Sequence, residues 1–197
     1  LADLPSEERS LAKIIDTINR HHGEYKEATF SRWGDKTPLN SFCMQEITDI
    51  FPDAKFIHMI RDPADVVRSY LKHDLQPDLE AGADRWKRAV ESVRNFEQKK
   101  NRVINVYYED FVSKPEEETR AVCSFLEMDF RSSWVGRTDH RNEIDEVAGR
   151  EYHSNVFNSI STKHIGKGRR ELDTEELRRL DYLIGEECEN LGYEPLV

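Results

Sequence analysis

Cysteine is scarce in this chain, with three residues among 197: Cys43, Cys123 and Cys188. They lie far apart and follow no metal-ligand spacing, so the sequence offers neither a disulfide framework nor a zinc site. Each falls in a stretch with helical periodicity. We therefore expect three free, buried thiols in a reducing compartment, with the cytoplasm as the location and no bound metal.

Long apolar runs are also missing, and the longest aliphatic stretch lies near residues 103–106. A membrane-spanning helix needs about 20 apolar residues, so we expect no span within these residues. Clustered basic residues are scarce as well, because 39 Asp and Glu outnumber 29 Lys and Arg and give a formal charge of -10. That balance disfavours nucleic acid or another polyanion as a ligand. The length predicts a single domain over residues 1–197.

The most informative segment that is present covers residues 55–71, KFIHMIRDPADVVRSYL. Its first six residues are typical of a buried strand, and Asp62 and Pro63 are typical of the N-cap and first position of a helix. Arg61 then lies at the carboxyl end of the strand. Open α/β sheets bind ligands at that edge, where a guanidinium offers forked donors that match phosphate oxygens.

A phosphate site is one interpretation of this segment, and an ordinary strand, cap and helix is the other. The ordinary unit explains every residue except Arg61 and Ser69. Ser69 lies six residues after Pro63, about 9 Å along a helix, so a bound anion would lie beside the helix and not at its N-terminus. Periodicity does not decide which flank of the helix faces such an anion.

Strands alternate with helices along the rest of the chain. A second buried strand is expected within residues 103–112, and helices are expected at about residues 6–21, 39–50, 81–100, 113–128 and 174–191. Residues 113–116 have the sequence of a capping box, and Gly192 is typical of a C-cap. This order predicts an α/β fold with a parallel sheet flanked by helices.

The segment RDPADVVRS resembles the 3'-phosphate-binding signature of the sulfotransferases that use 3'-phosphoadenosine 5'-phosphosulfate (PAPS). In that family an Arg at the end of a strand is followed eight residues later by a Ser, and Arg61 and Ser69 match both positions. The resemblance implies that these two side chains bind the 3'-phosphate of the donor. Three further segments match in the family's order, so the resemblance extends from residue 33 to about residue 172.

Residues 33–38, WGDKTP, are similar to the Lys-x-Pro element of this family. Lys36 is the matching lysine, and the resemblance implies a catalytic role for it. An ammonium near the bridging oxygen stabilises the charge that develops on the leaving phosphate. The alternative is a Gly-Asp turn with an exposed Lys before a helix that starts at Thr-Pro.

Residues 103–112, VINVYYEDFV, resemble the family's Tyr-Glu-Asp element. Tyr108 is the match, which implies a position near the adenine, for which an aromatic ring offers a flat apolar surface. Tyr107 and Tyr108 alternate faces, so we expect one of them to be an ordinary core residue. Glu109 and Asp110 could suggest a metal or acid-base pair, but a loop entering a helix is the simpler interpretation.

Residues 161–172, STKHIGKGRREL, are similar to the basic glycine-containing loop that closes over the 3'-phosphoadenosine in this family. Lys167, Gly168 and Arg169 are the implied cofactor-binding residues, because glycine lets the backbone approach phosphate and cations neutralise it. A solvated loop before a helix capped by Asp173 or Thr174 is the alternative. The chain departs from its relatives here, since Gly-Arg-Arg stands where many of them carry an aromatic residue.

One element of the family has no counterpart, namely the glycine-rich loop that holds the 5'-phosphosulfate in the manner of a P-loop. The residues begin at Leu1 with neither a Met nor a first strand. We expect that strand and loop to lie upstream. The implied fold is a P-loop NTPase-like, three-layer α/β architecture that is incomplete at its N-terminus. Residues 131–158 correspond to a region that covers the acceptor site in relatives, and we expect an irregular lid there.

These matches predict a sulfotransferase that moves a sulfuryl group from PAPS to a hydroxyl or amine, releases 3'-phosphoadenosine 5'-phosphate (PAP) and uses no metal. The acceptor could be a small molecule, a carbohydrate or a peptide, and the oligomeric state stays open. Two alternatives remain: a nucleotide kinase-like phosphotransferase, which would need magnesium and a complete P-loop, and a non-catalytic nucleotide-binding or interaction domain. The Arg-Asp-Pro to Ser spacing favours sulfuryl transfer.

Overall fold

The computed structural model describes residues 10–25, 32–98, 102–135 and 160–197. The chain divides into two compact units, Leu1–Ala54 and Lys55–Val197. Among the described residues, no helix combines the length and the apolar character that crossing a membrane requires. The predicted lid falls mostly on residues 136–158, which lie outside the described residues.

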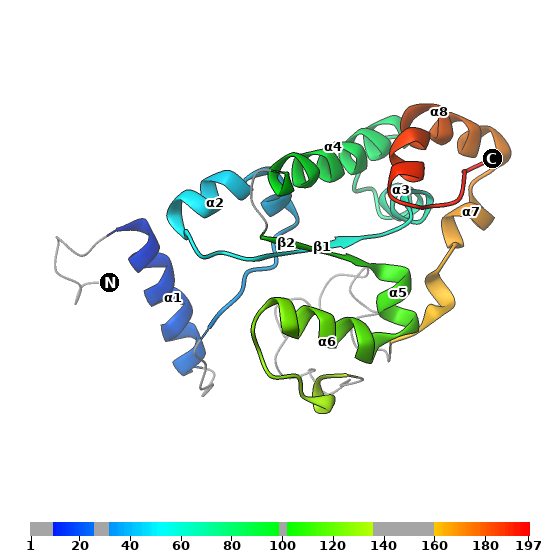
Figure 1. The fold of residues 1–197 in the computed structure, drawn as a ribbon. Coiled ribbons are helices and arrows are strands. Elements are labelled where there is room, and N and C mark those ends of the chain that lie inside the picture. Colours follow the sequence, from blue (N-terminus) through cyan, green and yellow to red (C-terminus); the bar gives the residue numbers. More distant parts are fainter. Residues whose placement is uncertain (1–9, 26–31, 99–101, 136–159) are drawn as a thin grey trace. The chain divides into compact units, whose positions relative to one another are not determined.

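The first unit contains the helices α1 (Leu11–Tyr25), η2 (Pro38–Phe42, a 3-10 helix) and α2 (Met44–Ile50) (Figure 1). Trp33 holds part of this unit together, because its Nε1 donates to Asp16 Oδ1 at 3.0 Å and its ring meets Phe51 edge-on at 5.4 Å. An indole with a satisfied N–H is a stable anchor for short helices.

The prediction of one helix over residues 39–50 is wrong. The backbone at Cys43 (φ -125°, ψ 24°) leaves the helical region and separates η2 from α2. Cys43 therefore does not lie on the packed face of a helix, and it is exposed. The prediction of a buried thiol is wrong at this position, whereas Cys123 and Cys188 are free and buried as expected.

The second unit is built on two parallel strands, β1 (Phe56–Ile60) and β2 (Val103–Tyr107). The register pairs Phe56 with Val103 and Ile60 with Tyr107, so the carboxyl ends of both strands lie side by side. The helices of this unit are α3 (Pro63–Lys72), α4 (Leu79–Glu97), α5 (Tyr108–Ser113), α6 (Pro115–Phe125), α7 (Lys167–Glu171) and α8 (Thr174–Asn190), with 3-10 turns η3 (Ser132–Trp134) and η5 (Thr162–His164).

Helices lie on both sides of the two strands. Figure 1 shows α4 and α8 on one side of the strands and α6 on the other, which is a helix–sheet–helix arrangement. The predicted α/β class with a parallel sheet is confirmed.

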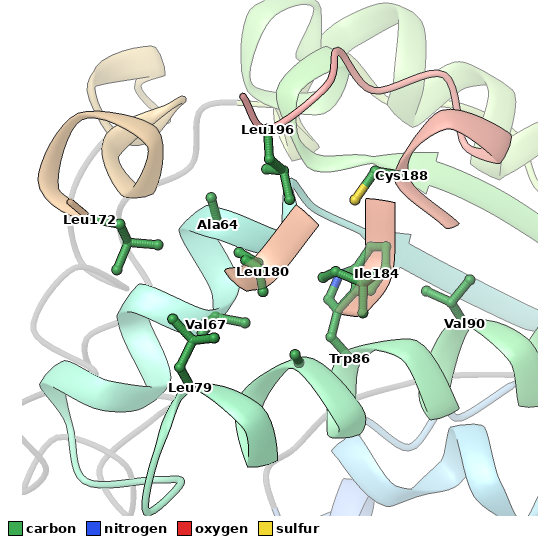
Figure 2. Packing of buried hydrophobic residues seen from close by; sticks show 11 residues of the cluster. Ala64, Val67, Leu79, Trp86, Val90, Leu172, Leu180, Ile184, Cys188 and Leu196 are labelled. Carbon is green, nitrogen blue, oxygen red and sulfur yellow. The ribbon is translucent and has the colours of Figure 1, made fainter. Parts of the chain in front are cut away.

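The main hydrophobic core lies where α3, α4 and α8 meet (Figure 2). Its buried residues are Ala64, Val67, Leu79, Ala83, Trp86, Val90, Leu172, Leu180, Ile184, Cys188 and Leu196. Trp86 also donates its Nε1–H to the carbonyl oxygen of Arg61 at 3.1 Å, which ties α4 to the end of β1. Burial raises the pKa of the Cys188 thiol to about 12, so this sulfur stays protonated and packs as a small apolar group.

Two predicted boundaries around β2 are wrong. The strand ends at Tyr107, and residues 108–113 form α5 where the end of the strand and a loop were expected. The predicted capping box at residues 113–116 is not formed, because Ser113 belongs to α5 and Lys114 takes the N-cap position of α6 without a side-chain bond. Glu116 instead pairs with Arg120 at 2.7 Å.

The C-terminal helix follows its sequence signals closely. Asp173 caps α8 and forms a capping box with Glu176, which confirms one of the two caps considered. The helix ends at Asn190, and Gly192 takes the left-handed conformation (φ 79°) just beyond it. Glycine adopts that conformation without the steric cost that other residues carry.

Candidate functional site

The candidate site lies at the carboxyl edge of the two strands. Arg61 and Asp62 follow β1 directly, and Tyr108 follows β2. Because Ile60 pairs with Tyr107 in the register, the residues after both strands emerge next to one another. This edge is where open α/β sheets bind their ligands.

Asp62 begins α3 as predicted. Its Oδ1 accepts hydrogen bonds from the backbone N–H groups of Ala64 (2.9 Å) and Asp65 (3.3 Å), and Pro63 occupies the first helical position. Both features stabilise a helix start, because the first N–H groups of a helix have no partner within it. The cap fixes the direction in which the chain leaves Arg61.

Arg61 is held from three directions. Its Nη2 donates to Asp65 Oδ2 at 3.0 Å and to the carbonyl oxygen of His164 at 2.9 Å. Its guanidinium lies over the Tyr108 ring, 4.4 Å from the ring centroid, where the electron-rich face attracts a cation. Its Nε is enclosed and has no hydrogen-bond partner among the described residues. One edge of the guanidinium is therefore anchored, and a buried donor on the side chain is unused.

The basic loop packs on the first turn of α3, although about 100 residues separate them. Gly166 donates its N–H to Asp65 Oδ2 at 3.1 Å, and Gly168 donates its N–H to Asp65 Oδ1 at 2.5 Å. Gly166 has a positive φ of 64°, which suits glycine. At Gly168, a Cβ would collide with the backbone carbonyl of Ala64, so only glycine permits this approach.

The two loop cations that the resemblance implies as cofactor-binding, Lys167 and Arg169, differ in their contacts. Arg169 donates from Nε to Asp62 Oδ2 at 2.7 Å, from Nη1 to the Pro195 carbonyl at 2.6 Å and from Nη2 to the Glu194 carbonyl at 2.7 Å. All three nitrogens of its guanidinium thus contact protein. Lys167 lies 3.6 Å from Glu171, and one third of its side chain is exposed. Lys167 is consequently the more accessible of the two cations.

Glu109 has a structural role that its sequence position does not reveal. Its Oε1 accepts from the Asp62 N–H at 3.0 Å, and its Oε2 accepts from the Tyr193 hydroxyl at 3.1 Å. Burial, with the neighbouring Glu109 carboxylate, raises the pKa of Tyr193, so this phenol stays protonated and keeps donating. Tyr107 packs edge-on against Tyr193 at 5.9 Å. Of the two adjacent tyrosines, Tyr107 thus packs in the unit and Tyr108 covers Arg61.

His164 contributes both its backbone and its ring to the site. Its carbonyl accepts from Arg61, and its ring Nε2 is enclosed without a partner among the described residues. Burial first, and then the nearby Lys163 and Lys167, lower the pKa of His164. The imidazole therefore favours its neutral form, which adds no positive charge beside Arg61.

Two further residues were named from the sequence, one in each unit. Ser69 is half-buried on α3, two turns beyond the cap. Lys36 belongs to the first unit and is exposed in the segment before η2, where the neighbouring Asp35 accepts from Thr37 (3.2 Å) and Asn40 (2.6 Å). The contacts of the second unit bring together Arg61, Tyr108 and the loop that holds Gly168 and Arg169. No group of acidic, His or Cys residues that could hold a metal occurs in the described ranges.

Sequence reasoning missed Asp65, which joins Arg61 to the loop. Locally, Asp65 is an acidic residue in the first turn of a helix, where it favours the helix dipole, and that explanation is sufficient by itself. Its partners Gly166 and Gly168 are 101 and 103 residues further along the chain. The usable signal was the pair of acids around Pro63, since Asp62 already supplies the cap and a second acid in the same turn is available for other partners.

Comparison with known proteins identifies a family. The sequence model of the sulfotransferase family matches residues 3–132. A protein of Caenorhabditis briggsae, provisionally named a protein-tyrosine sulfotransferase, is 25% identical over 180 residues, which cover 87% of this chain and 63% of the relative. The protein-tyrosine sulfotransferase of Drosophila melanogaster is 28% identical over 146 residues, which cover 70% of this chain and 28% of the relative. The chain thus spans less than two thirds of the length of these relatives.

Solved structures show the same fold. The sulfotransferase domain of the olefin synthase of Synechococcus PCC 7002 superposes with a TM-score of 0.70 at 19% identity, covering 93% of this chain and 64% of that one. The sulfotransferase domain of the curacin biosynthetic pathway gives a TM-score of 0.63 at 18% identity, covering 90% and 68%. The chain has the P-loop-like α/β fold of these domains.

Proposed function

This chain belongs to the sulfotransferase family, and on that premise we propose that the protein transfers a sulfuryl group from PAPS to an acceptor hydroxyl or amine. The observation that carries the proposal is the family match over residues 3–132, which includes Lys36, Arg61, Ser69 and Tyr108. The carboxyl-edge position of Arg61 and Tyr108 supports it, because both lie where this fold class takes ligands.

The residues at this edge fit a 3'-phosphorylated nucleotide. A guanidinium has five N–H donors, and Arg61 uses Nη2 for Asp65 and His164 while its buried Nε has no partner in the described part of the chain. A buried donor without a partner is costly, and a phosphate oxygen would satisfy it. We assign the 3'-phosphate to Arg61, Ser69 and Lys167, and the adenine to the neighbourhood of Tyr108.

Gly168 and Arg169 complete the cofactor-binding loop in this proposal. Gly168 allows the backbone of the loop to lie against α3, and Arg169 joins the loop to Asp62 and to the C-terminal residues. Their contribution is to hold the loop near the phosphate, with Lys167 as the more accessible of the two implied cations. A cation on a fixed backbone neutralises an anion without reorganisation.

When bound, PAPS supplies the sulfuryl group, whose bond to the 5'-phosphate oxygen breaks as a bond to the acceptor oxygen forms and the acceptor proton leaves. Lys36 is assigned to the leaving phosphate, because an ammonium stabilises the charge that develops on it. The relatives named as protein-tyrosine sulfotransferases make the phenolic hydroxyl of a peptide or protein tyrosine the first acceptor to test.

The donor assignment is tested by titrating the full-length protein with PAP in a calorimeter. Arg61→Ala removes a charge-assisted contact worth about 1.5–3 kcal/mol, so we expect PAP to bind about 10- to 100-fold more weakly. Arg88→Ala is the matched control, because Arg88 lies on α4 and two thirds of its side chain is exposed. Equal affinity in Arg61→Ala and the unmodified protein would remove Arg61 from the site.

The transfer itself is tested with PAPS and a panel of tyrosine peptides and small hydroxyl compounds, followed by mass spectrometry of the acceptors. The proposal expects a mass gain of one sulfuryl group on at least one acceptor class, with PAP released in equal amount. A protein that binds PAP tightly yet sulfates no member of a broad panel would favour the non-catalytic alternative.

A further inference from the structure

Asp65 is the most deeply buried carboxylate at the candidate site. Its side chain has no exposed surface, yet both oxygens accept hydrogen bonds. Oδ1 accepts from the Gly168 N–H at 2.5 Å, and Oδ2 accepts from the Gly166 N–H at 3.1 Å and from Arg61 Nη2 at 3.0 Å. A buried carboxylate is tolerated when it is paired and hydrogen-bonded in this way.

The three donors come from the two parts of the chain that are assigned to the 3'-phosphate. Arg61 is the residue at the end of β1, and the two glycines flank Lys167 in the basic loop. Asp65 is a single group that contacts both, and it does so from the rigid first turn of α3, whose start is fixed by Asp62 and Pro63. Any displacement of Asp65 would move the guanidinium and the loop together.

Anchoring through Nη2 also fixes which donors of Arg61 are left for a ligand. The His164 carbonyl and Asp65 occupy Nη2, and the Tyr108 ring covers one face of the guanidinium. A free arginine side chain has many rotamers and loses roughly 2 kcal/mol of entropy when it is ordered. Here that ordering is already achieved by protein contacts, so a phosphate would meet a pre-organised donor.

We propose that Asp65 is a positioning residue for recognition of the donor's 3'-phosphate, acting through Arg61 and through the amides of Gly166 and Gly168. The inference rests on the proposed function, since it takes the 3'-phosphate as the ligand of these groups. Asp65 does not itself bind the anion, because its carboxylate is negative and both of its oxygens are occupied. Its effect is confined to the part of the ligand that Arg61 and the loop contact.

Because the effect of Asp65 is restricted to the 3'-phosphate, an experiment can distinguish a positioning role from a merely structural one. Asp65→Asn keeps the size of the side chain but places an N–H donor where one of the three donors now points, so at least one bond is replaced by repulsion. We compare the affinity of two probes in the full-length protein: PAP, and adenosine 5'-phosphate, which lacks the 3'-phosphate. A loss of general stability would weaken both probes alike.

The expected result is that Asp65→Asn weakens PAP about tenfold or more while changing adenosine 5'-phosphate by less than about twofold. The preference for the 3'-phosphate, taken as the ratio of the two dissociation constants, should fall by the same factor. Asp84→Asn serves as the matched control, because Asp84 is exposed on α4. The substitution also removes one negative charge from a helix, as Asp65→Asn does. It should leave the ratio unchanged.

Each other outcome has a defined meaning. If the unmodified protein prefers PAP and Asp65→Asn keeps the full preference, the positioning role is refuted and the proposed function stands. If the unmodified protein shows no preference for PAP, the phosphate assignment in the proposed function fails first. If Asp65→Asn cannot be obtained folded, Asp65→Glu replaces it. That variant keeps the charge and displaces both oxygens by one methylene, and an unaltered preference in it would refute the inference as well.

Discussion

At the scale of single residues, Asp62 shows how one side chain can bind three elements together. Its Oδ1 caps α3, its Oδ2 accepts from Arg169 at 2.7 Å, and its backbone N–H donates to Glu109 on α5. The start of α3, the basic loop and the first turn of α5 therefore converge on one residue. A residue with this many partners is sensitive to substitution, because each lost partner leaves another buried polar group unsatisfied.

Gly168 offers a sharp test of how closely the loop lies against α3. In Gly168→Ala the new methyl group would collide with the backbone of Ala64, which cannot move away as a flexible side chain could. We expect the variant to lose about 1–3 kcal/mol of stability, or to displace the loop at a similar cost. The measurement is the free energy of unfolding from denaturant titration.

Gly34→Ala is the control for this prediction. A methyl group added at Gly34 would meet no heavy atom within 4 Å among the described residues outside its immediate chain neighbours, and the φ of Gly34 is not positive. Alanine should therefore be tolerated there. Equal stability of Gly168→Ala and Gly34→Ala would mean that the loop does not pack on α3 as described.

The residues of the site fall into two groups: those whose contacts are with sequence neighbours, and those whose contacts are with distant parts of the chain. Asp62 and Pro63 could be placed from the sequence, because a helix cap depends on neighbours within three positions. The roles of Asp65 and Glu109 could not, since the backbone and side-chain partners that join them to other elements lie 47 to 103 residues away. Periodicity also left open which of Tyr107 and Tyr108 is packed in the unit, because that depends on Tyr193 near the C-terminus.

At the scale of elements, the same distinction explains the boundaries around β2. The run of β-branched and aromatic residues from Val103 predicted the strand correctly, but the five residues of β2 end where its partner β1 ends. Residues 108–113 then form a helix although they include two aromatic residues and a β-branched one. Strand length is set by pairing with a neighbour, which a local propensity does not contain.

The pairing of β1 and β2 also predicts a dependence of stability on pH. His58 lies opposite Asn105 in the register, and its Nδ1 is 2.9 Å from the Asn105 side-chain oxygen. Burial lowers the pKa of His58, outweighing the opposite effects of Asn105 and Glu97. The unfolded chain therefore takes up a proton at a higher pH than the folded protein does, and stability falls as the pH decreases through about 6.5.

Replacing His58 should make the free energy of unfolding depend less steeply on pH at acid pH. One proton corresponds to a slope of at most about 1.4 kcal/mol per pH unit, and His58→Gln should reduce the slope below about pH 6.5. A residual slope is expected, because the pKa of His164 is lowered in the same direction. The check is the unfolding free energy measured at several pH values. His22→Gln, a change at an exposed position of α1, should leave the curve as it is, and an unaltered slope in His58→Gln would contradict the prediction.

At the scale of the whole molecule, burial is uneven between the two faces of β1 in the second unit. The face that carries Phe56 packs against Phe96 of α4, with ring centroids 5.2 Å apart. On the other face Ile57 and Met59 are 47% and 48% exposed. Parallel sheets are normally buried on both faces, so the helices α3, α4 and α8 supply most of the apolar contacts that hold this unit together.

This asymmetry predicts that two truncations of similar size will have very different effects. Leu180 of α8 is fully buried among α3, α4 and α8, as Figure 2 shows, and Leu180→Ala should cost about 2–5 kcal/mol through lost burial and the cavity left behind. Ile57→Ala removes a side chain that is about half exposed and should cost less than about 1.5 kcal/mol. Denaturant midpoints of the two variants, compared with the unmodified protein, measure the difference. A larger loss for Ile57→Ala than for Leu180→Ala would place the dominant core on the opposite side of the sheet, because the cost of truncating a side chain follows the area that it buries.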